Sequence, residues 1–469
     1  MKVNIIFFLI LSFNVNASLN SILKTYLENN FQIKESKLEY ESSLLDANKL
    51  RAANTFYLSY SGALITDNTE SSFTYKPNDN KTTSHTFSLS KAFSTGTSFS
   101  FEQNLSSNSG KDVFGQPLAE TYGASQKISV SQDLGQNFLG HNFRLNESIL
   151  NKTASIYKST YDLKIESGLL SLSTLYFTTA FLKELLDLRA EAVKRSISRL
   201  KLVKRRVRDG LAEKADRWQA ESALIESSSA REEIRLQLDS SFEQLHELLH
   251  QKISNKMVSK LTMKNIKIEN KDIKNNKQLL LYAKKLNLSK ISLKKYKNAY
   301  LPKVSLSFSY FSNDYATTSA GDAFSTSTIG SNQNSKTFGL NVSWPIGNEV
   351  EKLEKQKANI TKTQAEYSLK AINKNLTFQK EQIKKSIITY NKKVNFQKLK
   401  KVLALKTLRE MNRMYSKGRV DFDKVIRAEE SLIQTESSYF QSVLDYKKAV
   451  LNLYFLYGEV ESKLNQGEI

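Results

Sequence analysis

Residues 193–210 read VKRSISRLKLVKRRVRDG. Apolar side chains recur in this stretch every three or four residues, at Val193, Ile197, Leu200, Val203 and Val207. This spacing places them on one face of an α-helix and is typical of helices that pack side by side in a coiled coil. Gly210 ends the pattern, because glycine tolerates the left-handed backbone that closes a helix and lets the chain reverse. The stretch therefore predicts a long helix that meets a second helix at a glycine turn.

The same arrangement occurs twice in the chain. The first long helix is predicted over 136–209 and its second helix over 211–253, and their counterparts lie at 348–417 and 420–457. Five residues recur 208 positions later: Gly210, Ala220, Glu221, Leu224 and Ile225 return as Gly418, Ala428, Glu429, Leu432 and Ile433. Self-similarity on this scale indicates duplication of a supersecondary unit. The chain has only 4 prolines, which favours a few very long elements because proline breaks helices and central strands.

Two blocks between the helices alternate apolar and small polar residues, which predicts β-strands. They cover about 54–134 and about 303–345, and 304–310 reads VSLSFSY. One apolar face and one polar face are typical of an outer-membrane β-barrel with lipid outside and a wet lumen, and also of a soluble β-sandwich. The first block is the longer one. Its segment 87–105 predicts an additional hairpin around Thr95-Gly96, which either adds strands or forms an external loop.

The N-terminal residues 1–17 resemble a secretory signal peptide. Lys2 supplies a positive charge, an apolar run follows over 5–13, and Val15-Asn16-Ala17 supplies the small residues of a cleavage site. The run is too short for a spanning helix, and no other stretch reaches about 20 residues without charges. We therefore expect an exported chain without a transmembrane helix. The rest divides into a first repeat over 18–255, a lysine-rich linker over 256–277 and a second repeat over 278–469.

Composition excludes several classes of protein. Cysteine is absent, so disulfides, thiolate catalysis and thiolate metal sites are excluded. The formal net charge is +22, but the basic residues alternate with glutamates along the helices, as on a solvated face. No arginine-aromatic module of the kind that binds RNA occurs, so no nucleic-acid partner is expected. No phosphate-binding loop occurs either, and we expect no cofactor.

The order of helix, strands, long helix, glycine turn and helix, present twice, resembles the TolC family of outer-membrane efflux proteins. Four motifs contribute to the resemblance: Arg206 to Leu211 at the first tip turn, Tyr415 to Gly418 at the second, Asn298 to Pro302 at a helix-to-strand entry and Ser343 to Ile346 at a strand-to-helix exit. The resemblance implies a mixed α and β homotrimer with a β-barrel in outer-membrane lipid and an α-helical barrel extending into the periplasm. It also implies a periplasmic adaptor protein and an inner-membrane transporter as partners, in efflux or type I secretion.

The resemblance also implies where the duct closes. The tip turns contain Arg206, Gly210, Leu211 and Gly418. In the family, an aspartate after the first turn bonds to a tyrosine before the second, and Asp216 and Tyr415 stand at those positions. Some members carry two acidic rings after the second glycine. Lys424 and Arg427 occupy these positions here, which predicts basic rings at the constriction and a pore that is less cation-selective.

This chain departs from the family in three respects. The family pattern is two strands per half and twelve per trimer, whereas the first block here is long enough for more. The arginine that follows the second tip glycine in the family is replaced by Val420, and the first helix-to-strand entry lacks its proline. Part of the tip latch therefore differs from the family pattern, and the strand number depends on whether the additional hairpin adds strands or forms an external loop.

Two other functions compete with an export duct. His246-Glu247-Leu248-Leu249-His250 matches the pattern of zinc metallopeptidases, in which two histidines one helical turn apart bind zinc and a glutamate acts as the base. That chemistry needs a third ligand and an open metal position, and we assign no catalytic or metal residue. A trimeric surface or structural protein is the other alternative, because coiled-coil seams alone do not specify a channel. Trp218 is expected to pack in the apolar seam of its helix.

Overall fold

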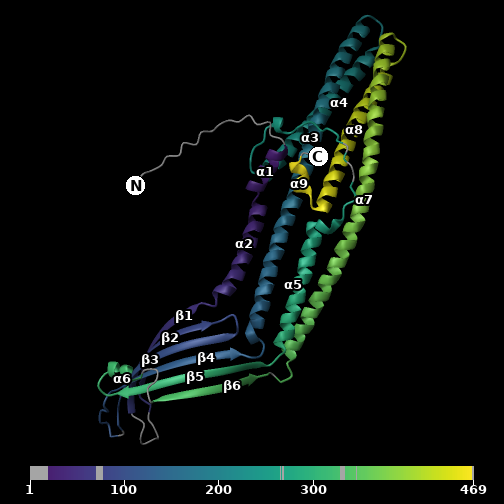
Figure 1. Ribbon diagram of the computed structural model, residues 1–469. Helices are drawn as coiled ribbons and strands as arrows, with labels where there is room; N and C mark the ends of the chain where they lie inside the picture. The colour runs from purple at the N-terminus through teal and green to yellow at the C-terminus, as the bar shows by residue number, and fades with distance from the viewer. Residues whose placement is uncertain are drawn as a thin grey trace. The chain divides into compact units, whose positions relative to one another are not determined.

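The computed structural model describes residues 19–69, 78–112, 114–264, 266, 269–327, 333–344 and 346–466. The expected signal peptide over 1–17 and Pro345 of the strand-to-helix motif lie outside the described residues. The chain is mixed α and β, as predicted (Figure 1). It forms two compact units, each built from separate segments of the chain. The helical unit comprises residues 1–38, 158–281 and 369–469, and the sheet unit comprises 39–157 and 282–368.

Four long helices form two matched pairs. The helix α3 (His141–Arg208) is followed by α4 (Lys214–Leu249), and α7 (Glu349–Ser416) is followed by α8 (Phe422–Tyr457). Both first members have 68 residues and both second members have 36. Each end of the second pair lies 208 residues after its counterpart in the first pair, which is the offset of the sequence repeat. We interpret this correspondence as duplication of the helix pair.

Several shorter helices complete the chain. They are α1 (Leu19–Asn29), α2 (Phe31–Ala52), α5 (Lys277–Ala299) and α9 (Val460–Asn465), with the 3₁₀ turns η1 (Phe138–Gly140), η2 (Asn255–Met257) and η3 (Ile273–Asn275). The core of the helical unit is a cluster of fully buried side chains from α3, α4 and α8, including Leu172, Leu245, Leu249, Tyr446 and Leu451. Burial of this apolar surface is the main force that holds these helices together.

The segment 256–277, expected to be an irregular linker, is packed against the helices. Val258, Leu261 and Ile273 are buried in the core of the helical unit. The hydroxyl groups of Tyr176 and Ser259 lie 2.8 Å apart and form a hydrogen bond. Its described residues therefore add to the core of the helical unit.

The sheet unit contains one antiparallel sheet of six strands in the order of the sequence. The strands, which lie side by side in Figure 1, are β1 (Phe56–Asp67), β2 (Asn78–Ala92), β3 (Thr97–Lys111), β4 (Thr121–Asp133), β5 (Lys303–Ala316) and β6 (Asn334–Ser343). A short helix, α6 (Ala320–Thr326), lies between β5 and β6 in the sequence. The first half of the chain thus contributes four strands and the second half two.

The additional hairpin is part of the sheet. The strands β2 and β3 pair with each other and also with β1 and β4, so the external-loop alternative is wrong. Their connection turns at Gly96, whose φ is +80°. A Cβ atom there would lie 2.4 Å from the carbonyl oxygen of Asn137, so both the conformation and the space favour glycine.

The two faces of the sheet differ in chemistry. Paired positions on β1 to β5 form an apolar row of Leu58, Leu89, Phe101, Ile128 and Tyr310, which ends at Lys336 on β6. The next row begins at Tyr57 on β1 and continues with Ser90, Ser100, Ser129 and Ser309. No second sheet covers the apolar side within the described residues, and Leu58 remains 79% exposed. The soluble β-sandwich, in which one face is buried, is therefore not the architecture of this chain.

One described helical stretch, Phe138–Arg208, is long and apolar enough by length and composition to cross a membrane. Of its 18-residue apolar window, 56% is buried inside the molecule. Leu172 and Tyr176 of α3 belong to the core of the helical unit. A helix that is buried in a protein core passes the same test of length and composition. The stretch is therefore only weak evidence for a membrane span.

Candidate functional site: the helix tips

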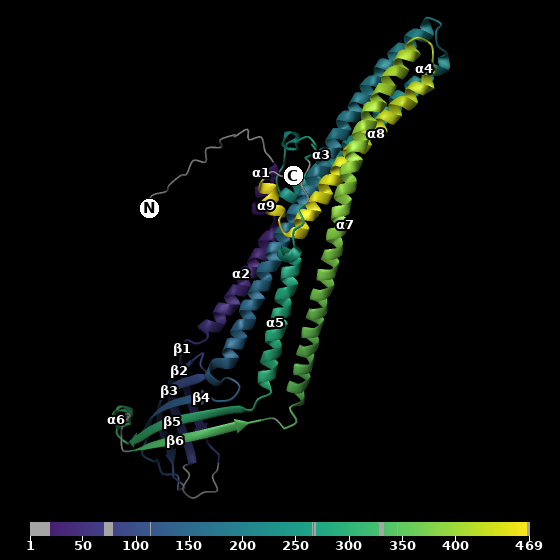
Figure 2. The same ribbon diagram turned by 45° about the vertical axis from the view of Figure 1, so that its right-hand side comes forward.

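The two tip turns have the same backbone geometry. Gly210 and Gly418 both have a φ of +70°. After the first helix, the N–H of Leu211 donates to the carbonyl of Arg206 at 2.8 Å, and after the second the N–H of Arg419 donates to the carbonyl of Met414 at 3.0 Å. These bonds define Schellman motifs, which satisfy carbonyl groups at the end of a helix and require a left-handed residue. Both turns lie at the same end of the helical unit, where α3, α4, α7 and α8 run side by side (Figure 1 and Figure 2).

Arg206 joins the two turns. Its guanidinium group donates to the carbonyl of Leu211 at 3.0 Å and to the carbonyl of Tyr415. The same group lies over the ring of Tyr415, 4.4 Å from the centroid. Hydrogen bonds from a charged donor are stronger than neutral ones, and a cation above an aromatic ring adds attraction. One side chain from the end of α3 therefore holds the end of α7.

Tyr415 is buried in a small apolar cluster below the turns. The side chain is 3% exposed and packs with Phe422, Val425, Leu408 and Val203. Burial raises the pKa of the Tyr415 phenol, while the charge of Arg206 lowers it and the charge of Asp216 raises it. The hydroxyl group has no hydrogen-bond partner among the residues that the structure describes.

Asp216 does not bond to Tyr415 in the single chain. The Asp216 carboxylate accepts a hydrogen bond from the backbone N–H of Glu213 at 3.3 Å, as one half of a capping box at the start of α4. The expected latch partners thus occupy the same tip, but Asp216 caps its own helix. The contact that links the two turns is instead formed by Arg206.

Lys424 and Arg427 are both exposed on the first turns of α8. The Nε atom of Arg427 lies 2.9 Å from a carboxylate oxygen of Asp423, one helical turn earlier on the same helix. This ion pair offsets part of the basic charge that the sequence predicted at the constriction. Lys424 lies in the first turn of α8, where its backbone N–H donates to the carbonyl of the N-cap residue Asp421 at 3.2 Å.

The structure adds a buried ion cluster that the sequence did not predict. Glu429 is 4% exposed, and its carboxylate pairs with Arg199 and with Arg195, whose Nε lies 2.8 Å away. Burial, together with the charge of Arg195, lowers the pKa of Arg199 to about 10. Buried charges are costly unless they are paired, so the cluster ties α3 to α8. The sequence offered one hint, because Glu429 is the repeat counterpart of Glu221.

Two apolar surfaces of the helical unit remain uncovered. On α4, Trp218 is 65% exposed and Ile225 is 70% exposed. On α7, a second set of large apolar side chains is exposed: Phe378, Ile388, Phe396, Leu399 and Leu403. The expectation that Trp218 packs in a seam is therefore wrong for the single chain. Exposed apolar surface of this extent is typical of protein interfaces.

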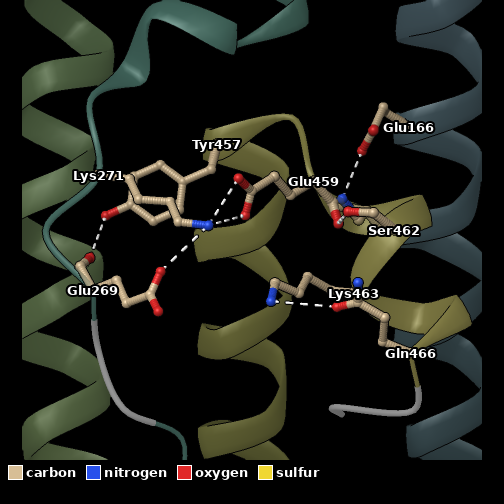
Figure 3. A network of polar contacts seen from close by, with 9 residues as sticks. Glu166, Glu269, Lys271, Tyr457, Glu459, Ser462, Lys463 and Gln466 are labelled. Carbon is tan, nitrogen blue, oxygen red and sulfur yellow. Dashed lines mark hydrogen bonds and ion pairs between the residues drawn. The ribbon is translucent and has the colours of Figure 1, made fainter.

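At the other end of α8, polar contacts fix the end of the chain (Figure 3). Lys271 lies between Glu269 and Glu459, with its Nζ 2.9 Å from the nearer Glu459 oxygen and 3.3 Å from Glu269. The carboxylate of Glu166 on α3 accepts the backbone N–H of Val460 at 3.1 Å. Burial raises the pKa of Glu166 to about 7, although this hydrogen bond and Lys277 lower it. These contacts hold α9 against α3 and the segment before α5.

The residues of the metallopeptidase pattern are not arranged as zinc ligands. The helix α4 ends at Leu249, and His250 is its left-handed cap with a φ of +51°. The His246 ring nitrogen lies 3.1 Å from the carbonyl of Ile253, and the His250 ring contacts Phe31. Among the described residues, no three His, Cys, Asp or Glu side chains form a group that could hold a metal ion. The two histidines therefore do not share one face of a continuous helix, which the pattern requires.

No family model and no curated protein sequence matches this chain. Solved structures do. The Campylobacter jejuni CmeC outer membrane channel aligns with a TM-score of 0.69 at 13% identity, over 97% of this chain and 89% of that chain. The outer membrane protein VceC from Vibrio cholerae aligns with a TM-score of 0.68 at 12% identity, over 94% and 95% of the two chains. The open state of the Neisseria gonorrhoeae MtrE outer membrane channel aligns with a TM-score of 0.68 at 12% identity, over 94% and 88%.

The fold is therefore that of the TolC-like outer-membrane channels, as the sequence predicted. Each comparison aligns 94% or more of this chain. These neighbours are channel proteins and not enzymes.

Proposed function

We propose that this chain is the subunit of a homotrimeric exit duct in the outer membrane, with its helical unit in the periplasm. The single observation that supports this most is the shared fold with outer-membrane channels over more than nine tenths of the chain. In this proposal, residues 1–17 direct export and are removed, and residues 18–255 and 278–469 are two repeats of one structural unit. The duct operates with a periplasmic adaptor and an inner-membrane transporter, in efflux or in type I secretion.

Assembly from several copies is supported by surfaces that one chain leaves open. The apolar residues Trp218 and Ile225 on α4, and Phe396 and Leu399 on α7, are exposed in the single chain. In the part of the chain that the structure describes, the sheet has two edge strands, β1 and β6, each paired on one side only. Backbone groups at a sheet edge cannot stay unpaired in lipid, so a membrane-embedded sheet of this kind must be closed by other copies.

The duct opens at the helix tips, where Arg206 joins the two glycine turns through the carbonyl groups of Leu211 and Tyr415. Release of these contacts would allow the end of α7 to move away from the end of α3. The proposed channel is passive, because its fold supplies a conduit and a gate, and the energy for transport comes from the inner-membrane partner.

Single-channel recording in planar bilayers tests this proposal. The purified trimer is expected to give discrete conductance steps. A folded trimer that gives no conductance would overturn the duct and would favour a trimeric surface protein built from the same coiled-coil seams.

A further inference from the structure

The sheet of this chain has six strands, and its outer edges are formed by β1 and β6. Among the described residues, β1 pairs only with β2, over residues 56–67, and β6 pairs only with β5. Both edge strands are exposed along nearly their whole length, with 12 residues in β1 and 10 in β6. Each edge thus presents a row of backbone N–H and C=O groups that is ready to pair with another strand.

The topology makes the two edges complementary. All five pairings in the sheet are antiparallel. With an even number of strands in sequential order, β1 and β6 run in opposite directions. When β6 of one copy meets β1 of the next copy in a ring, the new pair is antiparallel like every pair within the chain. This contact between two copies, called the joint below, therefore continues the antiparallel order of the sheet.

Six strands are too few to close on themselves. Membrane barrels of single chains begin at about eight strands, at which size side chains already fill the interior. Three copies of a six-stranded sheet supply eighteen strands, in the range where porins leave an aqueous channel. The diameter of a barrel grows roughly in proportion to its strand number. Eighteen strands therefore give a bore about 1.5-fold wider than a twelve-stranded one.

The polar face of the sheet consists mostly of short side chains. Apart from Tyr57 on β1, two adjacent rows on this face contain short side chains: Ser90, Ser100, Ser129, Ser309 and Thr337 in one, and Ala92, Ser98, Ser131, Ser307 and Gly339 in the other. Such side chains reach only a short way into a lumen and are uncharged. The charged residues Glu102 and Lys127 stand opposite each other on neighbouring strands, where their charges offset each other. This face suits a wide and nearly neutral bore.

We infer that three copies of this chain join the β1 edge of one to the β6 edge of the next, forming an eighteen-stranded barrel with a serine-lined bore. The inference rests on the proposed function, because it takes the sheet to lie in the outer membrane with its apolar face toward lipid. It goes beyond that function by naming the joint, the strand number and the chemistry of the outer mouth. A mouth of this kind admits large solutes of either charge.

Disulfide trapping tests the joint directly, because the chain has no cysteine of its own. Ser61→Cys in β1 is combined in turn with Ser335→Cys, Thr337→Cys or Asn341→Cys in β6, which scans the register across the joint. Oxidation is expected to give a ladder up to covalent trimer on a non-reducing gel, reversed by reductant. The matched control combines Thr86→Cys with the same β6 positions. Thr86 pairs with Ser61 but lies one strand inward, so no ladder is expected.

Electron microscopy of the detergent-solubilised trimer provides the second measurement, and eighteen strands are expected. Twelve strands, with β2 and β3 outside the barrel, would overturn the inference, as would a link confined to a single chain. Conductance is recorded on the same preparations. A trimer that conducts but forms no ladder at any of the three positions contradicts the β1–β6 joint alone, whereas a folded trimer without conductance contradicts the proposed duct.

Discussion

The helices α4 and α8 have the same length and equivalent places in the repeat, but they differ sharply in burial. α8 buries eighteen of its 36 side chains and α4 buries six. Ile225 on α4 is 70% exposed, whereas its counterpart Ile433 is partly buried. The two copies of the unit have therefore taken different positions, with α8 packed inside the chain and α4 at its surface. We therefore predict that α4 meets a neighbouring copy in the proposed trimer.

The same contrast holds for the paired charges. Glu221 on α4 forms ion pairs with Arg217 and Lys204 at the surface, at 3.1 and 3.2 Å. Glu429, its counterpart on α8, is buried against Arg195 and Arg199. A surface pair contributes little to stability because water screens it, whereas a buried charge left without its partner is strongly destabilising.

The largest effect on the free energy of unfolding is expected for a substitution of Glu429. Glu429→Gln leaves Arg199 buried beside Arg195 without a carboxylate, and should lower the free energy of unfolding by about 3–5 kcal/mol. Glu221→Gln is the matched control and should change it by about 0–1 kcal/mol. Denaturant unfolding followed by circular dichroism measures both. Equal effects at the two positions would contradict the difference in burial between α8 and α4.

Trp218→Ser tests whether the exposed face of α4 is an interface between copies. Loss of a large aromatic side chain at a packed interface costs about 2 kcal/mol or more, or roughly 30-fold in the dissociation constant. We expect the trimer to dissociate at higher protein concentration while the helical content of each chain is retained. The neighbouring exposed residue Gln219 provides the control, as Gln219→Ala. An unchanged trimer in analytical ultracentrifugation would show that this face of α4 is not an interface.

The pH dependence of stability tests the contact between Glu166 and the backbone after α8. Its pKa is raised to about 7 in the folded chain from 4.5, the value of an exposed glutamate. As pH rises through this window, the unfolded chain loses the proton before the folded chain does. Stability should therefore fall between about pH 4.5 and 7 and stay lower above it, by on the order of 1–3 kcal/mol. Glu166→Gln should remove this part of the pH dependence. A variant with the same slope as the parent would refute the assignment.

Substitutions of Arg206 and Tyr415 distinguish two contacts that could close the tip, namely the Arg206 hydrogen bonds and the bond between Asp216 and Tyr415. Arg206→Ala removes the donors to the carbonyl groups of Leu211 and Tyr415, and should destabilise the closed tip by about 1–2 kcal/mol. Tyr415→Phe removes a hydroxyl group that has no partner among the described residues, and should have a small effect. Open probability in single-channel records measures both. A larger effect of Tyr415→Phe would mean that the trimer supplies the Asp216 latch.

The smallest effect on stability is expected at the basic positions of α8. Lys424 is the repeat counterpart of Asp216, so the two tips carry opposite charges at equivalent positions. If Lys424 and Arg427 line the constriction, their focused potential favours anions, and added salt weakens the preference. The double variant Lys424→Asp and Arg427→Asp should shift the reversal potential in a salt gradient toward cation selectivity. Strong cation selectivity in the parent, or no shift in the variant, would refute this role.

The sequence by itself determined the local structure of this chain. Apolar spacing and the glycines at 210 and 418 placed the long helices within a few residues of their observed ends, and strict alternation placed the strands of both blocks. The same local signals predicted the two glycine turns, because glycine tolerates the left-handed backbone that ends a helix. Local propensity and periodicity belong to a short stretch of chain, so a sequence displays them directly.

Only the tertiary structure decided which of two equivalent surfaces is covered. Ile225 and Ile433 have the same pattern around them, as do Glu221 and Glu429, but burial depends on which helix lies opposite. Pairing of the additional hairpin with β1 and β4, and the link from Arg206 to the carbonyl of Tyr415, join residues distant in the sequence. Such contacts depend on the summed packing of many elements. No short stretch of sequence contains that information.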